Sequence, residues 1–173
     1  MQKLANFHMV NEDVVISLGT NLGNKKSNLI FAISKIKSFS KIITQSKIFH
    51  SEPWGYHSKN TYLNMGLLIH TCYPPLELLK KLKNIENEMG REEKSSDQYE
   101  DRIIDLDILI FSNILLNTKK LSLPHPKIGL RRFSLLILKD LYCSQSIPGL
   151  NNTADELLKR NKDYSKIDVF EEL

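Results

Sequence analysis

The order of apolar patterns along the chain predicts an α+β protein with a ferredoxin-like β-α-β-β-α-β core, an antiparallel sheet and C-terminal additions. Short β-branched runs, typical of strands, alternate with two amphipathic segments of helical period. No internal repeat or long linker interrupts the 173 residues, a length that favours one domain over residues 1–173. In such a core the helices pack on one face of the sheet, which leaves the other face for loops and ligands.

Four strands are expected in this core. The first, at 13–19, is rich in β-branched residues and ends at a glycine. The second, at 41–49, alternates partially between apolar and polar residues, and the third covers 61–71. The fourth, at 102–111, is an apolar run that contains two aspartates, and the apolar residues 114–116 could form a hairpin arm with it.

Two amphipathic helices are expected between the strands, at 26–39 and 74–89. The second begins with prolines and is followed by Gly90, which is typical of helix ends. Residues 132–142 and 153–160 predict two further helices. The apolar stripes expected to face the sheet are Leu29, Ile30, Ile33 and Ile36 in the first helix and Leu76, Leu79, Leu82, Ile85 and Met89 in the second.

The chain start, the hydropathy and the cysteines predict a cytoplasmic protein. Residues 1–12 are polar and aperiodic, so they are expected to form a flexible arm, and they lack the apolar core of a signal peptide. No run approaches the roughly 18 apolar residues that cross a bilayer. Cys72 and Cys143 stand far apart in the sequence, so reduced and mostly buried thiols are expected.

Arginine and lysine are distributed differently along the chain. The lysines are scattered between acidic residues, which usually indicates a solvated surface. The arginines begin only at residue 91, and four of them, Arg91, Arg102, Arg131 and Arg132, flank the aspartate strand or the segment after it. Arginine can bind phosphate through two parallel hydrogen bonds. The cluster therefore indicates a phosphate site, with chance clustering as the alternative.

The two aspartates of the fourth strand, Asp105 and Asp107, are the strongest indication of a site. Alternate residues of a strand share a face, so their Cα atoms lie about 6.6 Å apart on one side of the sheet. Ile104, Leu106, Ile108 and Ile110 are expected on the other side, in the core. Partly buried carboxylates repel each other, and a divalent cation such as Mg²⁺ relieves that cost. The alternative is an edge strand that carries charges against aggregation.

Six motifs occur in the order and near the spacing of one known family. The chain resembles the 6-hydroxymethyl-7,8-dihydropterin pyrophosphokinases of folate synthesis over about residues 13 to 142. The motifs that carry the resemblance are Ser17-Leu-Gly-Thr-Asn-Leu-Gly23, Ser51-Glu-Pro-Trp-Gly-Tyr56, Tyr62-Leu-Asn64, Gly90-Arg91, Arg102-Ile-Ile-Asp-Leu-Asp-Ile108, and Leu123-Pro-His-Pro126 with Arg131 and Phe133 after it.

The resemblance implies transfer of a diphosphate from ATP to the pterin hydroxymethyl group, with release of AMP. It implies that Asp105 and Asp107 hold two Mg²⁺ ions, which neutralise phosphate charge and lower the pKa of the attacking hydroxyl. Arg91 and Arg102 match the family's mobile-loop arginines, which approach the phosphates when the loop closes. The turn from Gly19 to Gly23 resembles a phosphate-binding loop but lacks its lysine, so it is expected to shape the site floor.

The resemblance also assigns residues to the two substrates. On the pterin side, Tyr62 or Trp54 would stack with Phe133 on the ring, Asn64 would hydrogen-bond its edge, and Ser51 would complete that edge. The residues implied for ATP are Glu86, Ile108, Lys120, Ser122, His125 and Arg131, together with Arg91 and Arg102. A stand-alone, monomeric enzyme with no nucleic-acid or membrane partner is expected.

The loop between Arg91 and Arg102 departs from the family pattern. The family often has a second arginine near its start and Trp-Gly-Pro-Arg at its end, whereas this chain has Glu93 and Tyr99-Glu-Asp-Arg102. We expect Tyr99 to replace the closing tryptophan and loop closure to be weaker than usual. Acidic residues such as Asp101 would be unfavourable near a triphosphate unless they point outward. Two alternatives to an active enzyme are a catalytically weakened relative that serves as a folate-pathway partner and a ferredoxin-like RNA-binding module.

Overall fold

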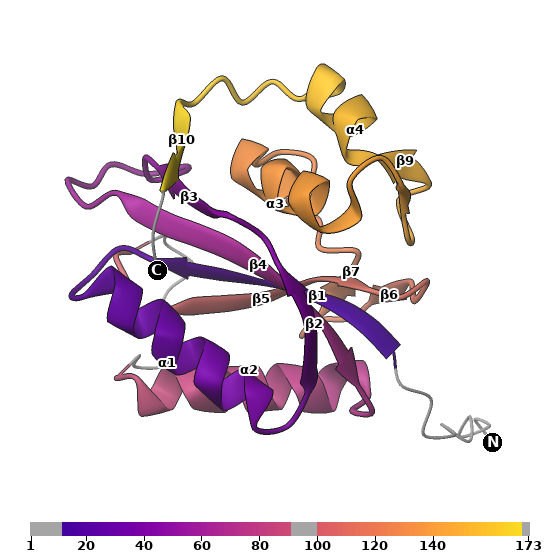
Figure 1. The fold of residues 1–173 in the computed structure, drawn as a ribbon, viewed down its shortest axis with the longest axis horizontal. Coiled ribbons are helices and arrows are strands. Elements are labelled where there is room, and N and C mark those ends of the chain that lie inside the picture. The colour runs from indigo at the N-terminus through magenta and orange to yellow at the C-terminus, as the bar shows by residue number, and fades with distance from the viewer. Residues whose placement is uncertain (1–11, 91–99, 171–173) are drawn as a thin grey trace.

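The computed structural model describes residues 12–90 and 100–170, which form a mixed α/β structure around one antiparallel sheet (Figure 1). The helices are α1 (Lys25–Lys37), α2 (Pro75–Glu88), α3 (Arg132–Tyr142) and α4 (Ala154–Arg160). The large sheet contains β1 (Glu12–Thr20), β2 (Lys41–Gln45), β3 (Ile48–Ser51), β4 (Tyr62–Thr71), β5 (Asp105–Phe111) and β10 (Ile167–Phe170). Two small hairpins join β6 (Leu116–Asn117) to β7 (Ser122–Leu123) and β8 (Ser146–Ile147) to β9 (Asn152–Thr153).

The main path through the large sheet runs β10-β3-β4-β1-β5, and β2 also pairs with β4. The two helices of the predicted core, α1 and α2, lie on one face of the sheet, but the prediction that the other face is left for loops and ligands was wrong. Figure 1 shows α1 and α2 beneath the sheet and α3 and α4 above it. Each face has its own apolar cluster: Val14, Ile16 and Leu18 belong to the α1/α2 side, and Val15 belongs to the α3 side. The fully buried run of β1 therefore reflects a strand covered on both faces.

The helices bury faces that differ in part from the expected stripes. In α1 the buried residues are Leu29, Ala32 and Ile36, whereas Ile30 is exposed. In α2 the buried residues are Pro75, Leu78, Leu82, Ile85 and Glu86, whereas Leu76 is exposed. Both helices carry apolar residues on more than one side, so periodicity alone did not determine which side faces the sheet.

The expected strand at 41–49 is divided into β2 and β3 at Ser46 and Lys47. The Ser46 backbone N–H donates to the Gly66 carbonyl at 2.9 Å, and the Gly66 N–H donates to Ser46 Oγ at 2.8 Å. These bonds fix a bend between two segments that both pair with β4. The outer edge of β3 is then covered by β10, a strand that the sequence did not predict.

A bulge in β5 changes the faces of its last residues. Val15 pairs with Ile110 and Ile16 pairs with Ile108, so Leu109 is the extra residue. Ile110 consequently joins the α3-side cluster and Phe111 joins the α1/α2-side cluster, which corrects the expected placement of Ile110. Asp105 and Asp107 precede the bulge, so they keep the common face that alternation predicts.

Two further expectations were wrong. Residues 114–116 do not form a hairpin arm with β5, because β6 pairs with β7 instead. Cys72 and Cys143 are free, as expected, but they are exposed.

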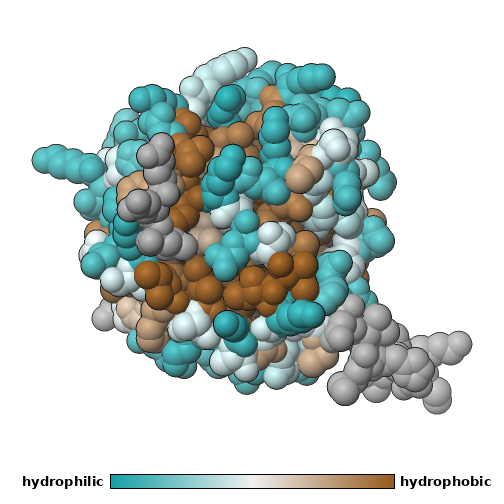
Figure 2. All heavy atoms as spheres, viewed as in Figure 1, coloured by the Kyte–Doolittle hydropathy of each residue, from teal (hydrophilic) through white to brown (hydrophobic). Residues whose placement is uncertain are grey.

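Within the described part of the chain, no helix is long and apolar enough to cross a membrane. Figure 2 shows the face seen in Figure 1, where polar atoms are interrupted by apolar patches.

We expect Gly66→Ala to destabilise the fold by about 1–3 kcal/mol through overpacking. A Cβ at Gly66 would overlap Cγ2 of the fully buried Ile137 and lie 3.2 Å from Cδ1 of Leu141. Urea unfolding would measure the loss. Gly129→Ala is the matched control, because a Cβ there has no neighbour within 4 Å. In an Ile137→Ala background the Gly66 substitution should cost less, and an unchanged cost would contradict the steric explanation.

Candidate active site

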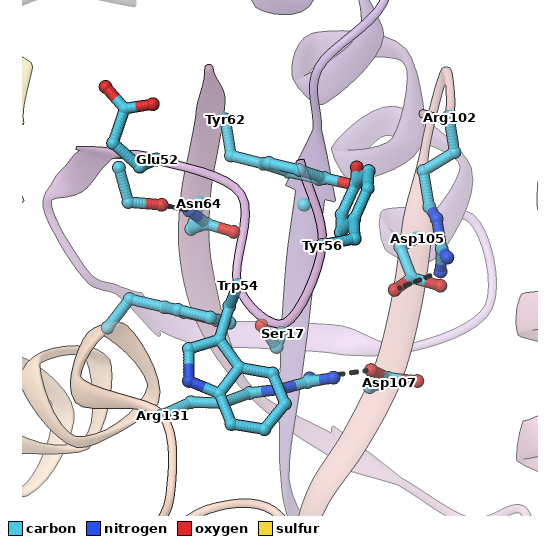
Figure 3. A pocket seen from close by; sticks show the side chains of 13 residues that line it. Ser17, Glu52, Trp54, Tyr56, Tyr62, Asn64, Arg102, Asp105, Asp107 and Arg131 are labelled. Atoms are coloured by element: carbon cyan, nitrogen blue, oxygen red, sulfur yellow. Dashed lines mark hydrogen bonds and ion pairs between the residues drawn. The ribbon is translucent and has the colours of Figure 1, made fainter. Parts of the chain in front are cut away.

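A pocket opens on the α3 side of the sheet, next to the start of α3 (Figure 3). The packing of α3 over Gly66 covers the middle of this face and leaves its end open. Strands β1, β3, β4 and β5, the loop at 52–61 and the first turn of α3 all contribute side chains. The lining residues are Ser17, Gly19, Ser51, Glu52, Trp54, Tyr56, Tyr62, Asn64, Arg102, Asp105, Asp107, Arg131 and Phe133.

The two aspartates lie side by side on β5 and each faces an arginine (Figure 3). Arg102 Nη1 is 2.8 Å from Asp105 Oδ2, and Arg131 Nη1 is 3.8 Å from Asp107 Oδ2. Their side chains are 22% and 29% exposed, so they remain accessible to a ligand. Burial, followed by the negative charge of Asp105, raises the pKa of Asp107.

The donor set of this carboxylate pair fits Mg²⁺. Among residues 12–90 and 100–170, no three His, Cys, Asp or Glu side chains gather into a metal-binding group. A cation at Asp105 and Asp107 would therefore have no third carboxylate, imidazole or thiolate ligand from the described residues. Mg²⁺ commonly binds in this way, through one or two carboxylates together with water and substrate phosphates.

An aromatic pair borders the aspartates and currently contacts an arginine. The Arg131 guanidinium carbon lies 5.1 Å from the ring centroid of Trp54 and 5.8 Å from that of Phe133. Both distances fall within the range of cation–π attraction. Figure 3 shows the Arg131 side chain passing along Trp54 toward Asp107. A flat ring that enters between the two aromatic side chains would therefore have to move this guanidinium.

A polar edge lies opposite the aromatic pair. Asn64 is 3% exposed, and its Nδ2 donates to Ser51 Oγ at 2.9 Å. A Cβ at Gly19 would lie 3.1 Å from Asn64 Oδ1 and 3.8 Å from the Tyr62 ring. Glycine at this position therefore keeps the floor open beside the amide. Of the Gly19–Gly23 stretch only Gly19, the next-to-last residue of β1, lines the pocket, so a floor role for the rest of the turn stays a prediction.

Tyr56, which was not predicted as a site residue, forms another part of the pocket wall. The Tyr56 and Tyr62 hydroxyls lie 2.7 Å apart, and both residues line the pocket (Figure 3). Burial is the largest cause that raises the pKa of each tyrosine, so both hydroxyls are protonated at neutral pH. Tyr56 is the last residue of the Ser51–Tyr56 motif that carries part of the family resemblance. Its place in this motif was the only sequence feature that could have identified it as a pocket residue. Ser17, Glu52 and Gly19 also line the pocket without having been assigned to a substrate.

Several residues expected to bind ATP do not line this pocket. Ile108 is 1% exposed in the core, Lys120 is exposed, and Ser122 Oγ donates to Asn117 Oδ1 at 3.1 Å. The His125 backbone N–H donates to the Leu109 carbonyl at 2.8 Å. Burial, opposed by the charge of Asp107 and reinforced by Arg131, lowers the pKa of the His125 imidazole.

Glu86 is 1% exposed and faces β5. Its Oε1 accepts the Leu106 backbone N–H at 2.7 Å, and Lys83 Nζ lies 2.9 Å from Oε2. The carboxylate thus satisfies a backbone donor on the outer edge of an edge strand. Arg91 and Tyr99, the two remaining predicted site residues, lie outside the described residues.

The fold and the pocket together define a class of protein. It is an α+β protein whose candidate small-molecule site combines a carboxylate pair, arginines and aromatic side chains. Residues 15–143 match the family model of the 7,8-dihydro-6-hydroxymethylpterin-pyrophosphokinases. The chain belongs to this family, as the motifs indicated.

Curated relatives agree with this assignment, and a solved structure shows the same fold. The chain is 35% identical over 128 residues to the 2-amino-4-hydroxy-6-hydroxymethyldihydropteridine pyrophosphokinase of Aquifex aeolicus, covering 74% of this chain and 79% of the relative. It is 34% identical over 138 residues to the protein of that name from Bacillus subtilis, covering 79% of this chain and 81% of the relative. It matches only 22% of the Dictyostelium discoideum folic acid synthesis protein FOL1. A Plasmodium falciparum HPPK-DHPS crystal structure shares the fold, with a TM-score of 0.70 at 20% identity over 92% of this chain and 46% of that chain.

We expect Glu86→Ala to destabilise the protein by about 1–3 kcal/mol, because the buried Leu106 N–H loses its acceptor. The free energy of unfolding in urea is the measurement. Glu88→Ala on the same helix is the matched control, since among the described residues Glu88 pairs with Lys35 at the surface and should contribute less than about 1 kcal/mol. Equal stability of the two variants, with weaker ATP binding only in Glu86→Ala, would instead indicate a nucleotide role.

Proposed function

We propose that this protein transfers the diphosphate of ATP to the hydroxymethyl group of 6-hydroxymethyl-7,8-dihydropterin, giving AMP and the pterin diphosphate for tetrahydrofolate synthesis. The observation that carries the proposal is one pocket, in a member of this family, that combines the Asp105–Asp107 pair with an aromatic and amide-lined slot. The pair suits a metal–phosphate group, and the slot suits a flat polar ring. Their juxtaposition suits a reaction between the two.

In this proposal Asp105 and Asp107 hold two Mg²⁺ ions, which when bound neutralise the triphosphate and lower the pKa of the attacking hydroxyl. Arg102 and Arg131 stabilise negative charge that develops on the transferring group. Both arginines now face the aspartates, so phosphate oxygens would compete with these carboxylates for their guanidinium groups. Arg91 supplies a further positive charge from the segment that precedes Arg102.

The pterin is proposed to stack between Phe133 and Trp54 or Tyr62, with its polar edge toward Asn64 and Ser51. Support comes from the position of all five side chains around one pocket. Tyr99 is proposed to close the site beside them.

The nucleotide is proposed to lie beyond the aspartates, near His125 and the β6–β7 hairpin. Lys120 and Ser122 belong to that hairpin region, and adenine would meet backbone groups around Ile108. Glu86 retains a predicted ATP contact alongside its structural hydrogen bond.

We further infer a single domain over residues 1–173, a monomer and a cytoplasmic location. The path β5-β1-β4-β3 supports a ferredoxin-like core, because it places the fourth, first, third and second core strands in that order. An RNA-binding role has less support, since the partly exposed carboxylates of Asp105 and Asp107 would repel a phosphate backbone. A catalytically weakened family member is the remaining alternative, motivated by the unusual sequence between Arg91 and Arg102.

We expect Asp107→Ala to lower product formation at least about 100-fold, because it removes a charge from the reacting centre. The assay contains ATP, Mg²⁺ and 6-hydroxymethyl-7,8-dihydropterin, and it measures AMP against pterin diphosphate. Asp168→Ala on β10 is the control, since that carboxylate is 54% exposed and pairs only with Lys166 among the ion pairs described. Wild-type ADP would contradict diphosphate transfer, and ATP binding without turnover would favour the weakened relative.

We also expect metal binding to weaken on acidification, beginning at a higher pH than for an ordinary carboxylate. The raised pKa of Asp107 means that its folded form keeps a proton where an exposed aspartate has lost it. Free Mn²⁺, measured by electron paramagnetic resonance as a substitute for Mg²⁺, should therefore increase as the pH is lowered, and the increase should begin above the ordinary pKa range of an aspartate. Asp107→Asn should bind weakly at every pH. Wild-type affinity that stays constant until the ordinary aspartate range is reached would refute the coupling.

A further inference from the structure

We propose that Asp101 is a positioning residue for the ring-binding half of the pocket. Its carboxylate holds the 52–61 loop so that Tyr56 stands against Tyr62 as part of the pocket wall. The inference rests on the proposed function, because the ring to be bound is the pterin. It concerns a residue that does not line the pocket and acts through others.

Four neutral donors converge on the Asp101 carboxylate. Oδ1 accepts from Asn21 Nδ2 at 2.7 Å and from the Tyr56 hydroxyl at 3.0 Å. Oδ2 accepts from Asn60 Nδ2 at 2.6 Å and from Ser58 Oγ at 2.8 Å. Each oxygen therefore receives two hydrogen bonds, and three of the four donors belong to one loop.

The carboxylate is suited to this role because it stays charged. Partial burial alone would raise its pKa, but the hydrogen bonds from Ser58, Asn60, Asn21 and Tyr56 lower the pKa of Asp101 to about 2. Hydrogen bonds to an ionised acceptor are stronger than those between neutral groups. The arrangement also shows where this acidic residue points: toward the loop rather than toward the metal-binding aspartates.

Asn21 extends the connection to the strand that carries the aspartates. This residue is 3% exposed, and its Oδ1 accepts the Arg102 backbone N–H at 2.7 Å. Its own backbone N–H donates to the Arg102 carbonyl at 3.1 Å. Its Nδ2 also reaches the Asn60 carbonyl at 3.2 Å. The turn after β1, the 52–61 loop and the segment before β5 are thus joined at one point.

The tyrosine pair connects this point with the pocket. The Tyr56 hydroxyl donates to Asp101, so in the 2.7 Å contact with Tyr62 it acts as the acceptor. Without the carboxylate, Tyr56 loses the partner that orients its hydroxyl, and the loop loses three anchors. Asp105 and Asp107 are held by β5 itself, so the metal-binding half should change little.

The test compares binding of the two substrates to Asp101→Ala and Asp101→Asn. Asp101→Asn keeps the side-chain volume. Its amide NH₂ would face two of the groups that now donate hydrogen bonds to the carboxylate, so those two bonds would be lost. Both variants should raise the pterin Kd about tenfold, equivalent to about 1.4 kcal/mol, and change the ATP Kd less than about twofold. Fluorescence of Trp54, the single tryptophan of the chain and a member of the same loop, reports pterin binding, and calorimetry reports ATP binding.

Two comparisons separate positioning from a general loss of structure. Asp140→Ala is the matched control: this carboxylate also holds the backbone, by accepting the Lys47 N–H at 2.9 Å, but Lys47, unlike Tyr56, does not line the pocket. Tyr56→Phe keeps the ring but removes the donor to Asp101, together with the contacts of that hydroxyl with Tyr62 and Asn21. In a double-mutant cycle, the effects of Tyr56→Phe and Asp101→Ala should be less than additive, because both changes break the Tyr56–Asp101 hydrogen bond.

The outcomes distinguish the inference from the proposed function. Wild-type chain that binds ATP but not the pterin would overturn both. Wild-type pterin binding that is unchanged in both Asp101 variants would overturn the positioning role alone. Equal weakening of ATP and pterin binding, an equal effect of Asp140→Ala, or strictly additive effects with Tyr56→Phe would also overturn it. A selective, non-additive loss of pterin affinity would establish it.

Discussion

The contact between α3 and β4 at Gly66 is the constraint on which the site depends. Because Gly66 has no side chain, Ile137 approaches the strand backbone closely, and α3 lies directly on the sheet. Asn64 and Tyr62 precede Gly66 on the same face of β4 and lie beyond the end of the helix. They therefore border the pocket instead of the core. The same docking brings Arg131 and Phe133, at the start of α3, to the pocket rim. One close backbone approach thus determines both where the core ends and where the pocket begins.

The charges in the pocket suit the ligand that we propose, which carries negative charge of its own. Asp105 and Asp107 are each opposed by an arginine, which reduces the cost of keeping two carboxylates together in the free protein. A metal ion and a polyphosphate could replace these contacts pairwise, with the metal taking the carboxylates and the phosphate taking the arginines. The contact of Arg131 with Trp54 and Phe133 adds a link between the phosphate and ring halves.

Local sequence patterns predicted the elements well where one type of residue dominates. The structure has β1, β4, α3 and α4 close to the expected ranges. Nine of the predicted site residues line one pocket. The errors arose at elements whose boundaries or faces are determined by contacts with residues far away in the sequence. The division of β2 from β3 depends on Gly66, and the faces of Ile110 and Phe111 depend on a bulge defined against β1. The role of Asp101 was invisible for the same reason, because its partners are 41 to 80 residues away.

The pairing of β10 with β3 has a consequence for the order in which the molecule can assemble. Ile167 of β10 pairs with Ser51 of β3, which is a pocket residue. The outer neighbour of β3 therefore comes from a segment more than a hundred residues later in the sequence. During synthesis the preceding strands and helices emerge first, and β3 waits with an unpaired edge until β10 leaves the ribosome. Closing so long a loop is entropically costly and favours a late step in folding. Completion of the sheet beside the pocket therefore waits until residues 167–170 have been synthesised.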